Sequence, residues 1–183
     1  MSEELVVRYC SPTLAGIKTG SLFSCDYESE TNLRDDIHSF NGILTPCGLR
    51  MLPMKRCGGR ALIYLYRPEK LSQDLADAEA VSLLKSFGYQ NSHAAQQVVH
   101  LVKRLRESSQ FPHEIGLFLG YPPEDVRGFI ENRGRHCKYT GFWKVYADEQ
   151  NACRLFENYR KCTKIYSRKY AEGTSIKRLI LTG

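Results

Sequence analysis

A pair of glycines between two strand-like runs constrains the fold of this chain more than any other local feature. The two runs are residues 49–56, LRMLPMKR, and residues 60–67, RALIYLYR. Gly58 and Gly59 between them tolerate the positive φ angles that a tight hairpin turn requires. We therefore expect an antiparallel hairpin near residues 49–66. Because proline has no N–H to donate, Pro53 favours an edge position for the first of the two strands.

Helical and strand-like segments alternate along the N-terminal part of the chain. Ser11 followed by Pro12 predicts the start of a short helix over residues 13–18, and residues 21–27 favour a strand. Apolar residues at helical spacing predict further helices over residues 29–44, from Pro68 to Gly88, and from Asn91 or Ser92 to about Ser108.

The C-terminal half is predicted to read strand-helix-strand-helix-strand. The segments are a strand over 113–119, a helix over 123–132, a strand over 138–146, a helix from Asp148 to about Ala171, and a strand over 175–182. This order is typical of right-handed βαβ units on a parallel sheet. Together with the hairpin, it predicts a single α/β domain over residues 1–183 with a mixed sheet. An α+β arrangement is the alternative.

Composition restricts the class of protein. The hydrophobic content of 42% and the charged content of 25% are those of an ordinary globular protein. No apolar run approaches the roughly 18 residues that a membrane helix needs. The N-terminal stretch MSEELVVRYCSP carries acidic residues where a secretory signal carries basic ones. We expect a cytoplasmic protein with no membrane partner.

The cysteines fit a reducing compartment. There are seven of them, an odd number, and none of the spacings is CxxC. This pattern favours free thiols over a disulfide framework. We predict no metal site, although one assembled in three dimensions from Cys47, Cys57, His136 and Cys137 is an alternative to idle thiols.

The stretch His113–Ile130, HEIGLFLGYPPEDVRGFI, admits two interpretations. As a turn, Gly120 lets the chain leave the preceding strand, and Pro123 sets the φ angle of the first helical residue. As a ligand site, the turn lies at the carboxyl end of a predicted strand, where open α/β sheets bind their ligands. Acidic residues open the helix, which excludes a nucleotide-phosphate loop. A neutral, cationic or aromatic ligand near Tyr121 remains the alternative to a purely structural turn.

Three segments, PTLAGIK, HEIGLFLGYPPEDVRGFI and GFWKVY, together resemble the bacterial family catalogued as domain of unknown function 3793, seen mainly in anaerobic Firmicutes. The resemblance covers nearly the whole chain. It implies a stand-alone cytosolic protein, and it brings no established activity, cofactor or catalytic residue.

Four residues are candidates for ligand binding: Lys18, His113, Tyr121 and Tyr146. Lys18 lies near a predicted helix end beside small residues, where it could bind a carboxylate or phosphate; a solvated lysine is the alternative. His113 and Glu114 are adjacent in a predicted strand, so they would point to opposite faces and form no acid–base pair. No known catalytic motif is present, and whether the protein is an enzyme stays open.

Basic residues concentrate near the C-terminus. Residues 133–183 hold 12 Lys and Arg against four Asp and Glu, a net charge of +8, whereas residues 1–132 have a net charge of −2. On the long predicted helix, one face is basic: Arg154, Lys161, Lys164 and Arg168. Such a face could bind nucleic acid, with Tyr139, Phe142 or Trp143 stacking on bases; a solvated basic face is the alternative.

Three classes of function follow. The preferred one is a cytosolic binding or accessory module that holds a small ligand, a cofactor or a protein partner. The second is an enzyme with a cysteine- or histidine-based site at the strand ends. The third, in which the partner is nucleic acid, uses the basic face of the C-terminal helix. The identity of a ligand or cofactor is not predicted.

Overall fold

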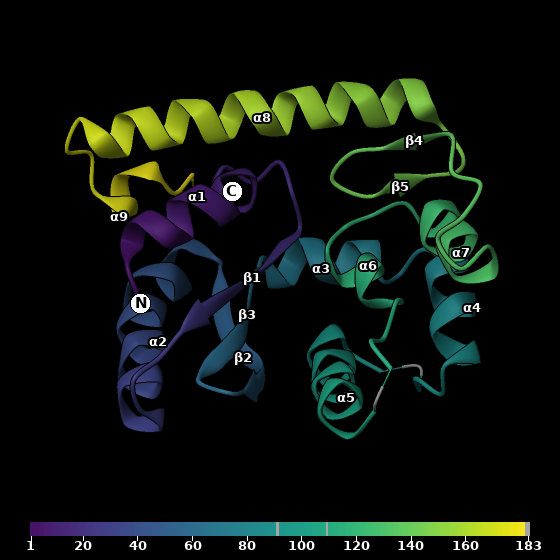
Figure 1. Cartoon of the computed structure of the whole chain (residues 1–183), viewed down its shortest axis with the longest axis horizontal. Helices are drawn as coiled ribbons and strands as arrows, with labels where there is room; N and C mark the ends of the chain where they lie inside the picture. Colours follow the sequence, from purple (N-terminus) through teal and green to yellow (C-terminus); the bar gives the residue numbers. More distant parts are fainter. Residues whose placement is uncertain (91, 109, 182–183) are drawn as a thin grey trace. The chain divides into compact units, whose positions relative to one another are not determined.

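The computed structural model describes residues 1–90, 92–108 and 110–181 (Figure 1). Contacts within the chain divide it into two compact units, which are described separately below. The first unit comprises Met1–Glu69 and Lys161–Gly183, and the second comprises Lys70–Arg160. That residues 1–183 form a single domain stays a prediction.

The first unit is built on a three-stranded antiparallel sheet in the order β1-β3-β2. Its strands are β1 (Gly20–Asp26), β2 (Arg50–Cys57) and β3 (Arg60–Tyr66). The predicted hairpin is confirmed as β2 and β3, and the glycines of its turn have φ angles of 57° and 76°. The edge position of Pro53 is also confirmed, since β2 is an outer strand and its register shifts between Pro53 and Lys55.

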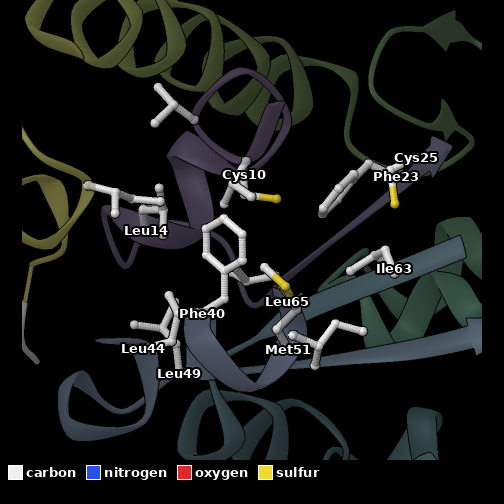
Figure 2. Packing of buried hydrophobic residues seen from close by; sticks show 14 of the residues in the cluster. Cys10, Leu14, Phe23, Cys25, Phe40, Leu44, Leu49, Met51, Ile63 and Leu65 are labelled. Carbon is white, nitrogen blue, oxygen red and sulfur yellow. The ribbon is translucent and has the colours of Figure 1, made fainter. Parts of the chain in front are cut away.

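Helices and the sheet enclose the apolar core of the first unit. The helical elements are α1 (Glu3–Leu14), α2 (Glu30–Leu44), the 3-10 turn η1 (Thr45–Cys47), α9 (Ile176–Leu179), the start of α3 (Pro68–Asp74) and the part of α8 (Glu149–Ala171) that follows Arg160. Figure 2 shows Cys10 and Leu14 of α1, Phe40 of α2 and the strand residues Ile63 and Leu65 as members of one apolar cluster, with the ring of Phe40 directed toward Cys10. The helix predicted over 29–44 is confirmed, and its apolar residues are buried as the spacing requires.

The short helix predicted over 13–18 is wrong. Helix α1 begins ten residues earlier, where the side chain of Ser2 caps it by accepting from the backbone N–H of Leu5. Glu3 and Glu4 then occupy the first turn, where the helix dipole favours negative charge. Pro12 lies inside the last turn of α1, so the Ser-Pro pair marks the end of a helix and not its beginning.

The second unit is mainly helical. It contains the rest of α3 from Lys70, α4 (Ala78–Ser86), α5 (Ala94–Glu107), α6 (Ile115–Phe118), α7 (Pro123–Glu131), a hairpin of β4 (Tyr139–Thr140) and β5 (Lys144–Val145), and the start of α8, up to Arg160. The helices predicted over 123–132 and 148–171 are confirmed as α7 and α8. The helix from Ser92 is confirmed as α5, which begins at Ala94. Asn91, the other predicted start, lies outside the described residues.

The strands predicted for the C-terminal half are wrong in two of three places. Residues 115–118 form helix α6 and residues 176–179 form helix α9, while the third predicted strand is the antiparallel β4–β5 hairpin. The end of the last predicted strand, Thr182, lies outside the described residues. The chain combines α and β structure as predicted, but every strand pair in the described part is antiparallel, so the mixed sheet is also wrong. Short apolar runs do not distinguish a strand from a helical turn by periodicity.

An aromatic cluster forms the core of the second unit around the hairpin. Its buried members are Trp143, Val145, Ala152, Phe156 and Tyr159. The ring of Trp143 meets that of Phe156 edge to face, with the centroids 4.5 Å apart. Gly141 permits this packing because a Cβ there would lie 2.2 Å from the Phe156 ring.

None of the helices in residues 1–90, 92–108 and 110–181 combines the length and the apolar character required to cross a membrane. The longest, α8, has 23 residues but carries many charges.

Candidate functional site

A pocket of about 330 Å³ opens beside Tyr121 in the second unit. It is lined by Gln73, Asp74, Asp77, Leu117, Gly120, Tyr121, Pro122 and Pro123. The turn of the HEIGLFLGYPPEDVRGFI stretch therefore forms one wall of a cavity. The prediction that this junction holds a ligand stays a prediction, and the pocket gives it a defined location.

The acidic wall of the pocket comes from the break between α3 and α4. The sequence predicted one helix from Pro68 to Gly88, but Leu75, Ala76 and Asp77 interrupt it. Asp77 caps α4, since its Oδ1 accepts from the backbone N–H groups of Glu79 and Ala80 at 2.8 and 3.1 Å. An aspartate followed by an acidic first turn is an N-cap signal, and it could have revealed this break from the sequence.

Tyr121 is held firmly against the hairpin. Its ring stacks on that of Trp143 with a centroid distance of 4.7 Å, and its hydroxyl donates to the carbonyl oxygen of Phe142 at 3.3 Å. Burial raises the pKa of Tyr121 to about 12, with a smaller contribution from Tyr159. The phenol is therefore uncharged at neutral pH. Its ring is available as an apolar wall of the pocket.

The glycines of this stretch are needed for close packing. A Cβ at Gly116 would lie 2.8 Å from a methyl group of Val126 and 3.1 Å from the ring of Tyr121. Gly120 adopts a φ of 75°, a conformation that L side chains rarely take, and it starts the turn toward Pro122. Small residues at these two positions let α6, the turn and α7 approach one another.

Asp125, in the acidic first turn of α7, is a structural residue. It is 3% exposed and accepts three hydrogen bonds. The donors are Trp143 Nε1 at 2.7 Å and the backbone N–H groups of Tyr146 and Ala147 at 2.7 and 2.9 Å. Asp125 therefore joins the start of α7 to the end of the β4–β5 hairpin. It holds the Tyr121–Trp143 stack in place.

Two of the other candidates in the second unit lie outside the pocket lining. His113 is exposed, and its ring lies 4.9 Å from that of Phe129. Tyr146 is half-buried against α7, where the absence of a side chain on Gly128 makes room for its ring. Neither His113 nor Tyr146 is among the described residues that line the pocket beside Tyr121.

Lys18 belongs to the first unit and is buried, with 6% of its surface exposed. Its ammonium group donates to the carbonyl oxygen of Gly20. Burial lowers the pKa of Lys18 to about 8, and the neighbouring Cys10 opposes this in part. The lysine was expected near a helix end, and it follows α1 by four residues. It is not the solvated lysine of the alternative interpretation.

The four basic residues of α8 are all exposed, while Phe156 and Tyr159 on the opposite face of the helix are buried. The three aromatic residues proposed for stacking on bases differ in how far their side chains are exposed. Trp143 is 7% exposed and committed to Asp125, Tyr139 is half-buried, and Phe142 is 42% exposed.

The thiols of Cys10, Cys25 and Cys162 are poor candidates for a reactive site. Burial raises the pKa of Cys10 to about 12 and that of Cys162 to about 11, and it also raises the pKa of Cys25. Raised values disfavour the nucleophilic thiolate. In the part of the chain that the structure describes, no group of three or more His, Cys, Asp or Glu side chains is arranged to hold a metal ion.

The fold and the pocket define a small α-and-β protein with an acidic, aromatic-lined cavity in its helical unit. The chain belongs to the family described as "Protein of unknown function (DUF3793)", whose model matches residues 6–180. The match confirms the resemblance seen in the sequence. Comparisons with curated proteins and with solved structures give no match.

Proposed function

We propose that this protein is a binding module that holds a small, positively charged ligand in the pocket beside Tyr121. The observation that carries the proposal is the composition of the pocket wall. It combines two carboxylates with a tyrosine ring and two prolines, and among its lining residues, all within the described part of the chain, none is Lys or Arg.

The charge of the pocket selects the ligand class. Asp74 and Asp77 disfavour phosphates and carboxylates and favour an ammonium or guanidinium group. The charge of Asp74 also acts on Tyr159, which does not line the pocket: burial raises the pKa of Tyr159 to about 12, and Asp74 makes a smaller contribution in the same direction. Trp143 covers one face of the Tyr121 ring, so a cation placed here would gain a cation–π interaction, worth about 0.5–2 kcal/mol, from the opposite face.

The size of the pocket supports a compact ligand. Its volume of about 330 Å³ is near the lower end of the roughly 300–1,000 Å³ typical of small-molecule sites. The apolar wall of Leu117, Pro122 and Pro123 suits a hydrocarbon or aromatic portion beside the cationic group. We infer a ligand with one charged end and one apolar end.

The residues that line the pocket support ligand binding more than catalysis as its function. The enzyme alternative requires a cysteine or histidine at the predicted strand ends, and among the described residues that line this pocket none is Cys or His. The exposed His113 lies elsewhere, beside Phe129.

Benzylamine and benzyl alcohol provide a matched pair of probes, since they share an aromatic ring and differ in charge at neutral pH. We expect calorimetry to show that benzylamine binds about tenfold or more tightly than benzyl alcohol, because only the amine gains the cation–carboxylate and cation–π terms. Native mass spectrometry of protein purified without oxygen would reveal a natural ligand that co-purifies.

Asp77→Asn tests the role of charge in this binding. Asparagine retains the ability to cap α4, so the fold is preserved while one negative charge is removed. We expect about tenfold weaker benzylamine binding and unchanged benzyl alcohol binding. Asp148→Asn is the control, because Asp148 also caps a helix, accepting from the N–H of Asn151, and does not line the pocket. Equal binding of the two probes, or equal loss in both variants, would refute the proposal.

A further inference from the structure

We propose that the exposed face of α8 binds the phosphate backbone of nucleic acid without reading its sequence. The residues concerned, called the basic stripe below, are Arg154, Lys161, Lys164 and Arg168. This surface is distinct from the Tyr121 pocket, and neither proposal depends on the other.

The basic stripe follows one continuous helix. Arg154 and Arg168 are 14 residues apart, so at about 1.5 Å per residue they are separated by about 21 Å along the axis of α8. Duplex nucleic acid carries one negative charge per about 1.7 Å of its axis, so a length of about 21 Å holds about twelve phosphates over both strands, and one side of the duplex presents several of them to the helix. A stripe of this length therefore meets several phosphates at once.

The burial of α8 orients the basic stripe toward solvent. Phe156 and Tyr159 are 0% and 4% exposed and anchor the opposite face of the helix in the core of the second unit. The intrahelical spacings of seven, three and four residues keep the four cations on one side. The stripe therefore lies along one helix and not on a loop.

Acidic residues neutralise the stripe only in part. Glu157 lies between Arg154 and Lys161 on the same side of α8. Glu172 lies 3.9 Å from Arg168, and both side chains are mostly exposed. An exposed ion pair of this kind is weak. Within Glu149–Ala171 there are six Lys and Arg residues against two Glu, so the helix keeps a strong positive charge.

The residues around the basic stripe favour nucleic acid over a membrane as its partner. They also favour contacts to the phosphate backbone over contacts to the bases. A membrane-surface helix needs a continuous free apolar face. In α8, Ala152, Phe156 and Tyr159 are buried in protein, and Ile165 is the large apolar side chain that is exposed, at 44%. Trp143 is 7% exposed and hydrogen-bonded to Asp125, which makes it unsuitable for stacking on bases. Contacts to phosphates alone position a protein on nucleic acid and carry no sequence information.

The test is fluorescence anisotropy with labelled 20-base-pair DNA and RNA duplexes of random sequence in increasing salt. Each phosphate contact contributes about −0.9 to the slope of log K against log salt, so four contacts predict a slope of about −3 to −4. Lys161→Glu with Lys164→Glu should reduce the size of that slope by about 2 and weaken binding about tenfold or more at low salt.

The matched control is Lys85→Glu with Lys103→Glu. These lysines are exposed on α4 and α5, and the double change alters the formal charge by the same amount. We expect it to leave affinity within about twofold, since it affects only the long-range field. Lys164→Gln with Arg168→Gln, which removes two charges without reversing them, provides a second variant of the stripe and should also weaken binding.

Four outcomes would overturn the proposal. They are no duplex binding by the natural sequence at low salt, equal losses in the stripe and control variants, binding that does not respond to salt, and stripe-dependent binding to phosphatidylserine vesicles with no binding to either duplex. The last outcome would assign the stripe to anionic lipid. A preference for one of the two duplexes would retain the proposal and identify the nucleic acid concerned.

Discussion

Trp143 donates its indole N–H to Oδ2 of Asp125 at 2.7 Å, and this hydrogen bond links the β4–β5 hairpin to α7. The other carboxylate oxygen of Asp125 accepts from two consecutive backbone N–H groups, those of Tyr146 and Ala147. All three donors are directed at one buried carboxylate. The wall of the Tyr121 pocket depends on this arrangement, because Tyr121 stacks on the same tryptophan.

Asp125→Asn should destabilise the second unit even though it preserves the shape of the side chain. The amide has only one acceptor oxygen, so its NH₂ group must face either the indole N–H or the two backbone N–H groups. We expect a loss of about 2–3 kcal/mol in the free energy of unfolding in urea. The chain has a single tryptophan, so its fluorescence reports on this site directly. Glu124 is the exposed neighbour of Asp125, and Glu124→Gln should change the free energy of unfolding by less than about 0.5 kcal/mol. Equal losses in the two variants would contradict the prediction.

Replacement by alanine should change the stability of the protein in opposite directions at two helical glycines. At Gly128 in α7 a Cβ would lie 2.5 Å from the Tyr146 ring, so Gly128→Ala should cost about 1–3 kcal/mol. At Gly42 in α2 no atom lies within 4 Å of that position, so Gly42→Ala should stabilise by about 0.5–1 kcal/mol. Thermal unfolding of the two variants measures both changes. Stabilisation by Gly128→Ala would show that Tyr146 moves aside freely.

Local sequence patterns predicted the features that depend on local physics. The hairpin at Gly58 and Gly59 follows from backbone freedom, and α2, α7 and α8 follow from helical periodicity or from proline and acidic residues at a helix start. The strands expected at 113–119 and 175–182 were wrong because burial alone, and not β-pairing, explains their apolar residues. Leu117 and Ile176 are buried as parts of short helices.

The candidate site could be predicted only in part for a related reason. Tyr121 and its turn are recognisable in the sequence, but Asp74 and Asp77 come from a helix break about 45 residues earlier. Their proximity to the turn depends on tertiary packing, which spacing along the chain does not encode. The same holds for Asp125. The sequence predicts that an acidic residue opens this helix, but the three donors to the Asp125 carboxylate lie 18 to 22 residues later in the chain.

Arg67 should be a major stabilising residue of the first unit. Its guanidinium donates to three backbone carbonyl oxygens, those of Thr13 and Leu14 at 2.8 Å each and that of Leu181 at 2.7 Å. These bonds tie the end of α1 to the C-terminal segment. Lysine cannot reproduce this planar arrangement of donors, so Arg67→Lys should cost about 2–3 kcal/mol in urea unfolding.

Arg60→Lys is the control for Arg67. Arg60 is mostly exposed, and its ion pair with Asp26 has an N–O distance of 3.3 Å. An exposed pair of this kind contributes about 1 kcal/mol or less, so the control should change stability by less than about 0.5 kcal/mol. Similar losses of unfolding free energy in Arg67→Lys and Arg60→Lys would mean that the three hydrogen bonds from Arg67 to backbone carbonyl oxygens do not stabilise the protein more than an exposed ion pair does.

Lys18 should make the stability of the first unit depend on pH in the alkaline range. Burial lowers the pKa of Lys18 from its ordinary value of 10.5 to about 8 in the folded protein. Between these values the unfolded chain holds a proton that the folded chain has released. The free energy of unfolding therefore rises with pH across this window, by about 1 kcal/mol between pH 8 and pH 9 from this group.

Other groups oppose this rise, so a variant is needed to isolate Lys18. Burial raises the pKa of Cys10 from 9.0 to about 12, and its contribution to stability declines once pH exceeds the value of the unfolded thiol. We therefore compare the natural sequence with Lys18→Met, which keeps the apolar length of the side chain and removes its charge. The difference in unfolding free energy, natural sequence minus variant, should increase by about 1 kcal/mol from pH 8 to pH 9. A difference that is constant, or that decreases with pH, would show that the buried lysine remains charged in the folded protein.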